Sequence, residues 1–80
     1  MPKLKILSSK DIVKILGSFS FETESQHGSH IKLSRVTVLG RQVLIVPNHD
    51  ELDKGTIKAI FNQANKYIPR GDLIGYFYTK

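Results

Sequence analysis

The chain has 80 residues, with 12 Lys and Arg against seven Asp and Glu, which leaves a formal charge of +5. This length suits one domain over residues 1–80, and an apolar fraction of 40% excludes a disordered chain. The lack of cysteine excludes disulfides and thiolate metal sites. No apolar run is long enough for a membrane span or a signal peptide, so we expect a cytoplasmic protein without a membrane partner.

The excess of positive charge favours a polyanionic partner such as a nucleic acid, because each neutralised phosphate releases counterions. The calculated isoelectric point near 9.7 reflects the same excess. Many small proteins, however, are basic only for solubility, so charge alone leaves both explanations open. Residues with specific chemistry have to decide between them.

A first helix is predicted over residues 9–17. The segment 8–11 offers a hydroxyl that can cap free N–H groups and an acid in the first turn. Ile12, Leu16 and Phe19 then recur at helical spacing and form one apolar stripe. This helix should therefore pack one face against a core.

Three strands are predicted next. Apolar and polar residues alternate from residue 19 to 24, which indicates a first strand with one dry face. A second strand is predicted over residues 30–38 and a third over 42–46, which Pro47 ends because proline cannot donate to a ladder. The turn between the first two strands centres on Gly28. Strands joined by tight turns must be antiparallel.

A second helix follows the strands. Asn48 and Glu51 have the spacing of a capping pair for a short turn. Asp53 then caps a longer helix, in which apolar residues recur at i, i+3, i+4 and i+7 from Ile57 to Ala64. This segment should bury a single apolar stripe.

The order of helix, three strands and helix predicts an α+β fold. Both helices cover one face of an antiparallel sheet and leave the other face to solvent. Double-stranded RNA-binding domains have this order of elements, and they read RNA through phosphates and 2′-hydroxyls. The core is expected over about residues 6–68, with residues 69–80 as a C-terminal extension that forms a last amphipathic turn.

Several short motifs support a more specific interpretation. Along the chain they are Ser9-Lys10-Asp11-Ile12-Val13, Phe19-Ser20-Phe21, Gly28-Ser29-His30, Val46-Pro47-Asn48-His49, Lys54-Gly55-Thr56-Ile57 and the segment from Ile60 to Gln63. Each is common alone, but together and in this order they resemble the HicA family of toxins. The resemblance covers most of residues 6–68 and none of residues 69–80.

HicA proteins are toxins of type II toxin–antitoxin systems that cleave mRNA. The resemblance therefore implies an endoribonuclease with a fold like that of a double-stranded RNA-binding domain. It also implies an mRNA substrate and a HicB-like antitoxin partner that holds the toxin inactive. In this family the histidine of the Gly-Ser-His motif is catalytic, which here is His30. At the position before this motif the family often carries a basic or polar residue, and this chain departs from that pattern with His27, which raises the question of a second titrating group.

RNA cleavage without a metal requires a base that takes the 2′-hydroxyl proton and an acid that protonates the leaving 5′-oxygen. Histidine suits either role because free imidazole titrates near physiological pH. His30 is predicted to face solvent, and Lys32 on the same strand face could stabilise charge on the phosphate. Gly28 would let RNA approach closely, and Ser29 adds a hydroxyl or amide donor. Most histidines at such positions are not catalytic, and the family resemblance reverses that expectation.

His27 and His30 also form an H-x-x-H pair, which raises the question of a metal. Two ligands with no carboxylate or thiol nearby in sequence fall short of the usual three or four. We therefore expect no metal, no other cofactor and no small-molecule substrate. His49 follows Pro47 and is expected to be a turn residue, although it could supply the missing acid.

Four lysines are predicted to contact RNA phosphates, helped by the positive ends of the helices: Lys10, Lys14, Lys54 and Lys58. A plain solvated helix face explains any one of them equally well. The main alternative function is a non-catalytic RNA-binding module of the same fold, which needs the lysines but not His30. A partner-binding domain with degenerate chemistry is a third possibility, and the intact Gly-Ser-His motif argues against it.

Overall fold

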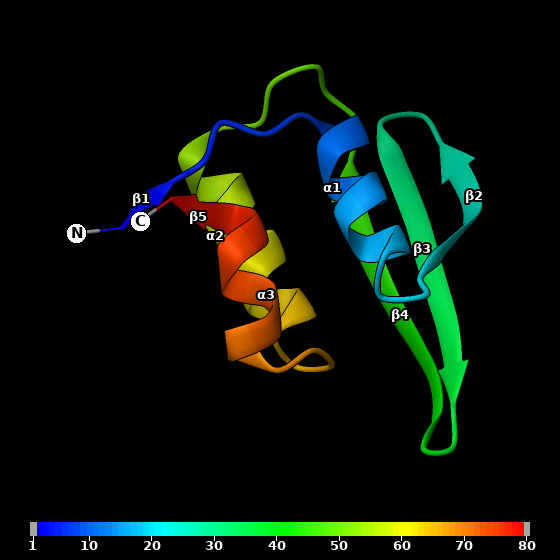
Figure 1. Cartoon of the computed structure of the whole chain (residues 1–80). Coiled ribbons are helices and arrows are strands. Elements are labelled where there is room, and N and C mark those ends of the chain that lie inside the picture. The colour runs from blue at the N-terminus through cyan, green and yellow to red at the C-terminus, as the bar shows by residue number, and fades with distance from the viewer. Residues whose placement is uncertain (1, 80) are drawn as a thin grey trace.

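The computed structural model of the protein describes residues 2–79 (Figure 1). In chain order its elements are β1 (Lys3–Leu4), α1 (Ser9–Gly17), β2 (Glu22–His27), β3 (His30–Thr37), β4 (Gly40–Pro47), α2 (Lys54–Ala64), α3 (Arg70–Phe77) and β5 (Tyr78–Thr79). Strands β2, β3 and β4 form an antiparallel sheet in that order, and β1 pairs separately with β5. Figure 1 shows the helices on one side of the three-stranded sheet. The predicted α+β fold is confirmed.

The core lies between the sheet and the helices. Alternate residues of β3 and β4 point into it, because successive side chains of a strand face opposite ways. On the sheet side the buried residues are Ile31, Leu33, Leu44 and Val46, and from α1 and α2 they meet Ile12, Leu16, Ile57, Ile60, Phe61 and Ala64. The opposite face of the sheet, called the open face below, therefore keeps the alternate residues of β3, which begin with His30.

The starts of α1 and α2 are capped as predicted. Ser8 and Asp11 form a reciprocal capping box at the start of α1. Asp53 accepts a hydrogen bond of 2.7 Å from the backbone N–H of Thr56 at the start of α2. Hydrogen bonds from Ser8 lower the pKa of Asp11, and those from Thr56 lower the pKa of Asp53. Both carboxylates are therefore charged at neutral pH, where they complement the positive helix ends.

The predicted start of the first strand is wrong. Residues 18–20 form a turn after α1, in which Ser20 has a left-handed φ of 73°, and β2 begins only at Glu22. Phe19 donates its N–H to the carbonyl oxygen of Leu16, which keeps it in the helix-terminating turn. Phe19 and Phe21 therefore make two separate packing contacts. Their spacing of two residues does not result from strand geometry.

The short turn predicted from Asn48 and Glu51 is also not formed. The segment 48–53 has no helical turn, because the backbone N–H of Asn48 donates to the carbonyl oxygen of Ser29 at 2.7 Å. That bond extends the pairing of β3 and β4 past Pro47. It also ties the segment after β4 to the turn between β2 and β3.

The C-terminal segment forms more structure than a last turn. Helix α3 buries Leu73 and Phe77 in the common core, and the Phe77 ring meets that of Phe61 edge to face at 5.4 Å. The Tyr78 ring lies 5.4 Å from the same Phe61 ring, and β5 pairs with β1. Residues 70–79 thus complete the core and bring the two ends of the described chain together.

Two polar side chains join separate elements of the fold. Arg35 on β3 donates to the side chain of Gln42 and to the carbonyl oxygens of Phe19 and Tyr67, at 2.7–2.9 Å. Gln63 on α2 accepts from the backbone N–H of Ile45 at 3.2 Å and donates to its carbonyl oxygen at 3.4 Å. Arg35 therefore links the sheet to both helix ends, and Gln63 links α2 to the outer edge of β4.

Ser9 holds the segment after β4 against α1. Its side chain is buried, with 1% of the residue exposed. The hydroxyl lies within hydrogen-bonding distance of the carbonyl oxygens of Pro47 and His49, and it accepts the His49 N–H at 2.6 Å. The single hydroxyl proton can go to only one of the two carbonyl oxygens at a time, so this buried side chain satisfies the His49 N–H and one carbonyl group of the segment.

We predict that Ser9→Ala lowers the free energy of unfolding by about 1–3 kcal/mol, because it leaves buried backbone groups unpaired. Chemical denaturation measures the change. Ser18→Ala is the matched control, since Ser18 is exposed and its hydroxyl bonds only within α1, so its effect should stay within about 0.5 kcal/mol. Equal destabilisation by the two variants would contradict the role of Ser9.

Candidate active site on the open face of the sheet

A two-residue turn, Gly28-Ser29, sets the geometry at the end of the sheet. Gly28 has a φ of 56°, which glycine adopts at the first central position of a type II′ hairpin turn. The turn places His27 on β2 directly opposite His30 on β3. A side chain at residue 28 would be strained by its backbone conformation rather than by neighbours, since nothing lies within 4 Å of an added Cβ. The glycine therefore has a backbone role in bringing the two histidines together.

His27 and His30 lie side by side on the open face. Directly paired residues of an antiparallel hairpin point to the same side of the sheet, with Cβ atoms about 5 Å apart. Both are exposed, and Pro47 of β4 flanks His30 on the other side. The sequence predicted His30 to face solvent, and the register agrees. Two exposed imidazoles at this separation can serve as a base and an acid for one substrate.

Lys32 lies on the same face, two residues along β3, and it forms an ion pair there. Its Nζ is 3.7 Å from Oε1 of Glu24, whose other carboxylate oxygen contacts Arg41 of β4. The hydrogen bond from Arg41, followed by one from Ser34, lowers the pKa of Glu24. Glu24 is therefore charged at neutral pH, and a phosphate bound by Lys32 has to compete with it. Sequence reasoning missed Glu24, because its role depends on cross-strand pairing that no local pattern shows.

His49 lies beyond the sheet. Its backbone N–H and carbonyl oxygen both bond to Ser9, and its side chain is exposed. Asp53 at the start of α2, whose pKa is lowered mainly by hydrogen bonds from Thr56, lies near enough to His49 for a smaller electrostatic effect in the same direction. His49 is thus in no strand register with His30, whereas His27 is.

The four predicted RNA-contacting lysines fall on two separate surfaces. Lys10 and Lys14 are exposed on α1 and border a groove of about 420 Å³ between α1 and β2. Lys54 and Lys58 are exposed on α2 and border another groove, of about 470 Å³, beside Lys3. The α2 surface adjoins the paired chain ends, away from the open face (Figure 1).

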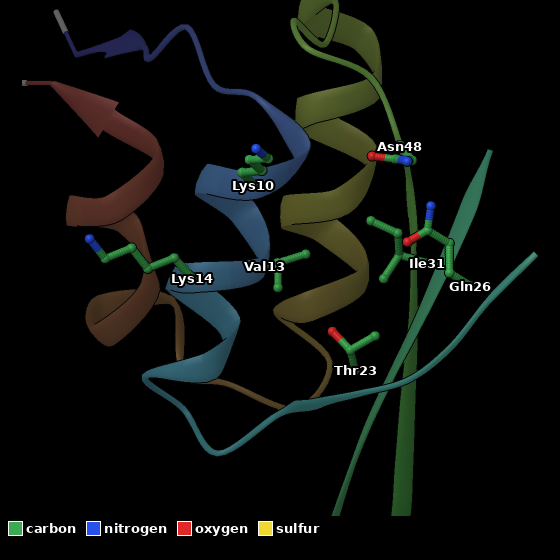
Figure 2. Close-up of a pocket in the computed structure, with 7 residues that line it drawn as sticks. All are labelled: Lys10, Val13, Lys14, Thr23, Gln26, Ile31 and Asn48. Carbon is green, nitrogen blue, oxygen red and sulfur yellow. The ribbon is translucent and has the colours of Figure 1, made fainter. Parts of the chain in front are cut away.

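The groove between α1 and β2 is shown in Figure 2. From α1 it is lined by Lys10, Val13 and Lys14, and from the sheet side by Thr23, Gln26, Ile31 and Asn48. Only the two lysines of this set were predicted as site residues. One sequence signal could have found others of the set. The residues of β2 on its core-facing side, Thr23 and Gln26, are polar, although they pair with Leu33 and Ile31.

Two further features bear on the function classes. Within residues 2–79, no group of three or more His, Cys, Asp or Glu side chains is arranged to hold a metal ion. None of the helices in the same range has the length and apolar character needed to cross a membrane.

Comparison with known proteins identifies the family. A model of the HicA toxin of bacterial toxin–antitoxin systems matches residues 9–66, which is more than half of the chain. This span includes α1, the three-stranded sheet and α2, together with His27, His30 and the Gly28-Ser29 turn. Searches of curated proteins and of solved structures find no match. The chain therefore belongs to the HicA family of bacterial toxins.

Proposed function

We propose that this protein is an mRNA-cleaving endoribonuclease toxin in which His30 acts in acid–base catalysis without a metal. The observation that carries the proposal is the pairing of His27 with His30 on an open sheet face, within the Gly-Ser-His motif. A cytoplasmic location, an mRNA substrate and a HicB-like antitoxin belong to the same proposal.

The reaction that suits two imidazoles is transfer within the RNA itself. One neutral imidazole takes the proton of a 2′-hydroxyl, and that oxygen attacks the adjacent phosphorus. The bond from phosphorus to the 5′-oxygen breaks, and the second, protonated imidazole gives its proton to the leaving oxygen. The products are a 2′,3′-cyclic phosphate and a 5′-hydroxyl end. We assign one role to His30 and the other to His27.

Lys32 would stabilise the negative charge that builds up on the phosphate oxygens. Its ion pair with Glu24 holds the ammonium group over the open face before RNA binds. A bound phosphate would then replace Glu24 as the partner of Lys32, while Arg41 keeps Glu24 paired. The Glu24 carboxylate thus positions the cation and also opposes the premature binding of small anions.

We predict that His30→Ala lowers the rate of RNA cleavage by about 10²- to 10⁴-fold, the usual effect of removing a positioned acid or base. His27→Ala should reduce the rate as well, and His49→Ala should change it less than threefold. Single-turnover cleavage of a labelled RNA measures all three rates, and circular dichroism checks the fold, which an exposed side chain should not affect.

The assignment is wrong if purified His30→Ala cuts RNA within a few-fold of the wild type. RNA binding measured on the same variant separates the two function classes. A non-catalytic RNA-binding module would show no cleavage by the wild type and undiminished binding by both proteins. A ribonuclease would lose cleavage and keep binding.

We also propose that the lysines of α2 contact RNA phosphates. The N-terminal end of α2 lies at the same end of the molecule as the turn between β2 and β3 (Figure 1), so one RNA could reach both. Lys54 and Lys58 are four residues apart, on one face of the helix, and Lys3 adds a third charge to their groove.

Replacing Lys54 and Lys58 together by Ala should weaken all RNA sequences about equally and flatten the salt dependence of binding. The slope of log affinity against log salt should fall by about 0.7 for each lost contact to single-stranded RNA. Fluorescence anisotropy across a salt series measures it, with the exposed Lys66→Ala as control. An unchanged slope in the double variant would mean that Lys54 and Lys58 make no contact to RNA phosphates.

For the antitoxin, we propose direct cover of His30 by an acidic partner. The open face carries exposed apolar side chains beside its basic ones, with Val36 81% exposed and Ile45 39% exposed. A partner bound there excludes RNA by occupancy, and opposite charge would speed its association. A domain of this size offers few elements that could switch between two states instead.

Titration with the antitoxin should shift the ring resonances of His30 and the methyl resonances of Val36 and Ile45 in NMR spectra. Ile6 is 79% exposed on the N-terminal segment and serves as the matched control, whose methyl signals should stay unchanged. If the antitoxin abolishes cleavage while the His30 and Ile45 signals stay as in the free protein, the proposal of direct cover fails.

A further inference from the structure

We propose that the groove between α1 and β2 binds one unpaired nucleotide of the RNA, next to the nucleotide whose phosphate meets His30. This inference rests on the proposed ribonuclease function. Polar side chains of the groove would bind the edge of the base, and its lysines would bind the phosphate. The groove would thereby select the site at which the RNA is cut.

The groove exists because nothing apolar on β2 packs under α1. Thr23 and Gln26 are the residues of β2 on its core-facing side, and both are exposed. The register of β2 also shifts between Thr23 and Ser25, which bends the strand. On the helix side, Lys10, Val13 and Lys14 stand at i, i+3 and i+4, so a single face of α1 borders the opening.

The floor of the groove suits the flat face of a base. Val13 is half-buried and Ile31 is 7% exposed, so each offers apolar surface to the groove. Figure 2 shows Val13 pointing from α1 towards Ile31 and Gln26 across the opening. The volume of about 420 Å³ falls within the range of about 300–1,000 Å³ that small-molecule sites occupy.

The two amides in the groove are available to a ligand. Among residues 2–79, the side chains of Gln26 and Asn48 make no hydrogen bond to the protein. The amides of Gln42 and Gln63, in contrast, are committed to Arg35 and to the backbone of Ile45. Each free amide offers both donors and an acceptor, the combination that a base edge requires.

Charge at the groove favours a nucleotide over a neutral ligand. Lys10 and Lys14 border it on the α1 side, where Figure 2 shows the Lys14 side chain extending away from Gln26 and Ile31, and no carboxylate is among its lining residues. A phosphate alone could bind the lysines, but it would gain nothing from the apolar surface or the free amides. An unpaired nucleotide uses all three kinds of group, whereas a duplex keeps its base edges paired and presents mainly its backbone.

The groove and the open face meet at the same end of the sheet. Ile31 lines the groove, and its neighbour His30 faces the opposite side. Asn48, whose amide faces the groove, donates its backbone N–H to Ser29 at 2.7 Å. An RNA strand crossing the turn at residues 28–30 can therefore leave one base in the groove while the neighbouring phosphate lies at His30.

The experiment compares cleavage by variants that change only the two amides. Gln26→Ala and Asn48→Ala should raise KM about three- to tenfold for the preferred site, as expected for one lost hydrogen bond each. They should leave kcat within about twofold and broaden the bases accepted beside the cut, read by sequencing the ends of a cleaved RNA pool. Gln26→Glu keeps the size of the side chain but removes its donors, so it should change which base is preferred. Asn62→Ala, an exposed amide on α2, is the control and should change none of these.

Direct binding separates this inference from the ribonuclease function. Short single-stranded RNA is added to the His30→Ala protein while the methyl signals of Val13 and Ile31 and the side-chain amides of Gln26 and Asn48 are followed by NMR. Saturable shifts that depend on the base, and that inorganic phosphate does not reproduce, support the groove as a nucleotide site. That result would hold even if His30→Ala proved fully active, which would overturn only the catalytic assignment.

Three outcomes overturn the inference itself. One is loss of cleavage in His30→Ala together with unchanged KM and cut sites in Gln26→Ala and Asn48→Ala. Another is a set of groove signals that shift equally with inorganic phosphate and with every RNA, which means phosphate contact without base binding. The third is a response of the groove signals to the antitoxin but not to RNA, which assigns the groove to the protein partner.

Discussion

The register of β3 between its two neighbours is the constraint on which the rest of the structure depends. Ile31 and Leu33 point into the core, and this fixes His30 and Lys32 on the open face. A slip of one residue would bury an imidazole and an ammonium group and expose two large aliphatic side chains. The burial of Ile31 and Leu33 and the solvent exposure of His30 and Lys32 are therefore a single condition, and the positive φ of Gly28 allows the two-residue turn from which the pairing of β2 with β3 starts.

Because the exposed histidines take no part in packing, the site is separate from the stability of the fold. The core depends instead on long-range contacts between the sheet and the helices, because a chain of 80 residues buries only a modest share of its surface. Phe61 meets aromatic rings of both α3 and β5, and Arg35 ties β3 to the ends of two helices. The C-terminal helix, which lies outside the span of the family match, belongs to this same packing.

The sequence predicts those parts of the fold whose signals are local. The bounds of α1 follow from its cap and apolar stripe, and the start of α2 follows from Asp53. The open-face position of His30 follows from simple alternation along β3. Helix α3 was predicted only as a last amphipathic turn, because Pro69 and Gly71 interrupt the pattern before its buried residues Leu73 and Phe77. The sequence shows His27 and His30 only as an H-x-x-H spacing, because whether the two residues pair across the strands depends on the type of turn between them. Glu24 and the α1–β2 groove were missed because they arise only when separate segments meet.

The amide of Gln63 affects whether copies of the molecule can associate through the edges of their sheets. A sheet with three strands has two outer edges, and an unpaired edge is a template on which another chain can add a strand. On β4, the Gln63 side chain occupies the donor and acceptor of Ile45, as a neighbouring strand would. On β2, the irregular register between Thr23 and Ser25 bends the other edge out of a flat ladder. The fold therefore leaves a broad sheet face open for recognition while both of its edges resist the growth of the sheet into aggregates.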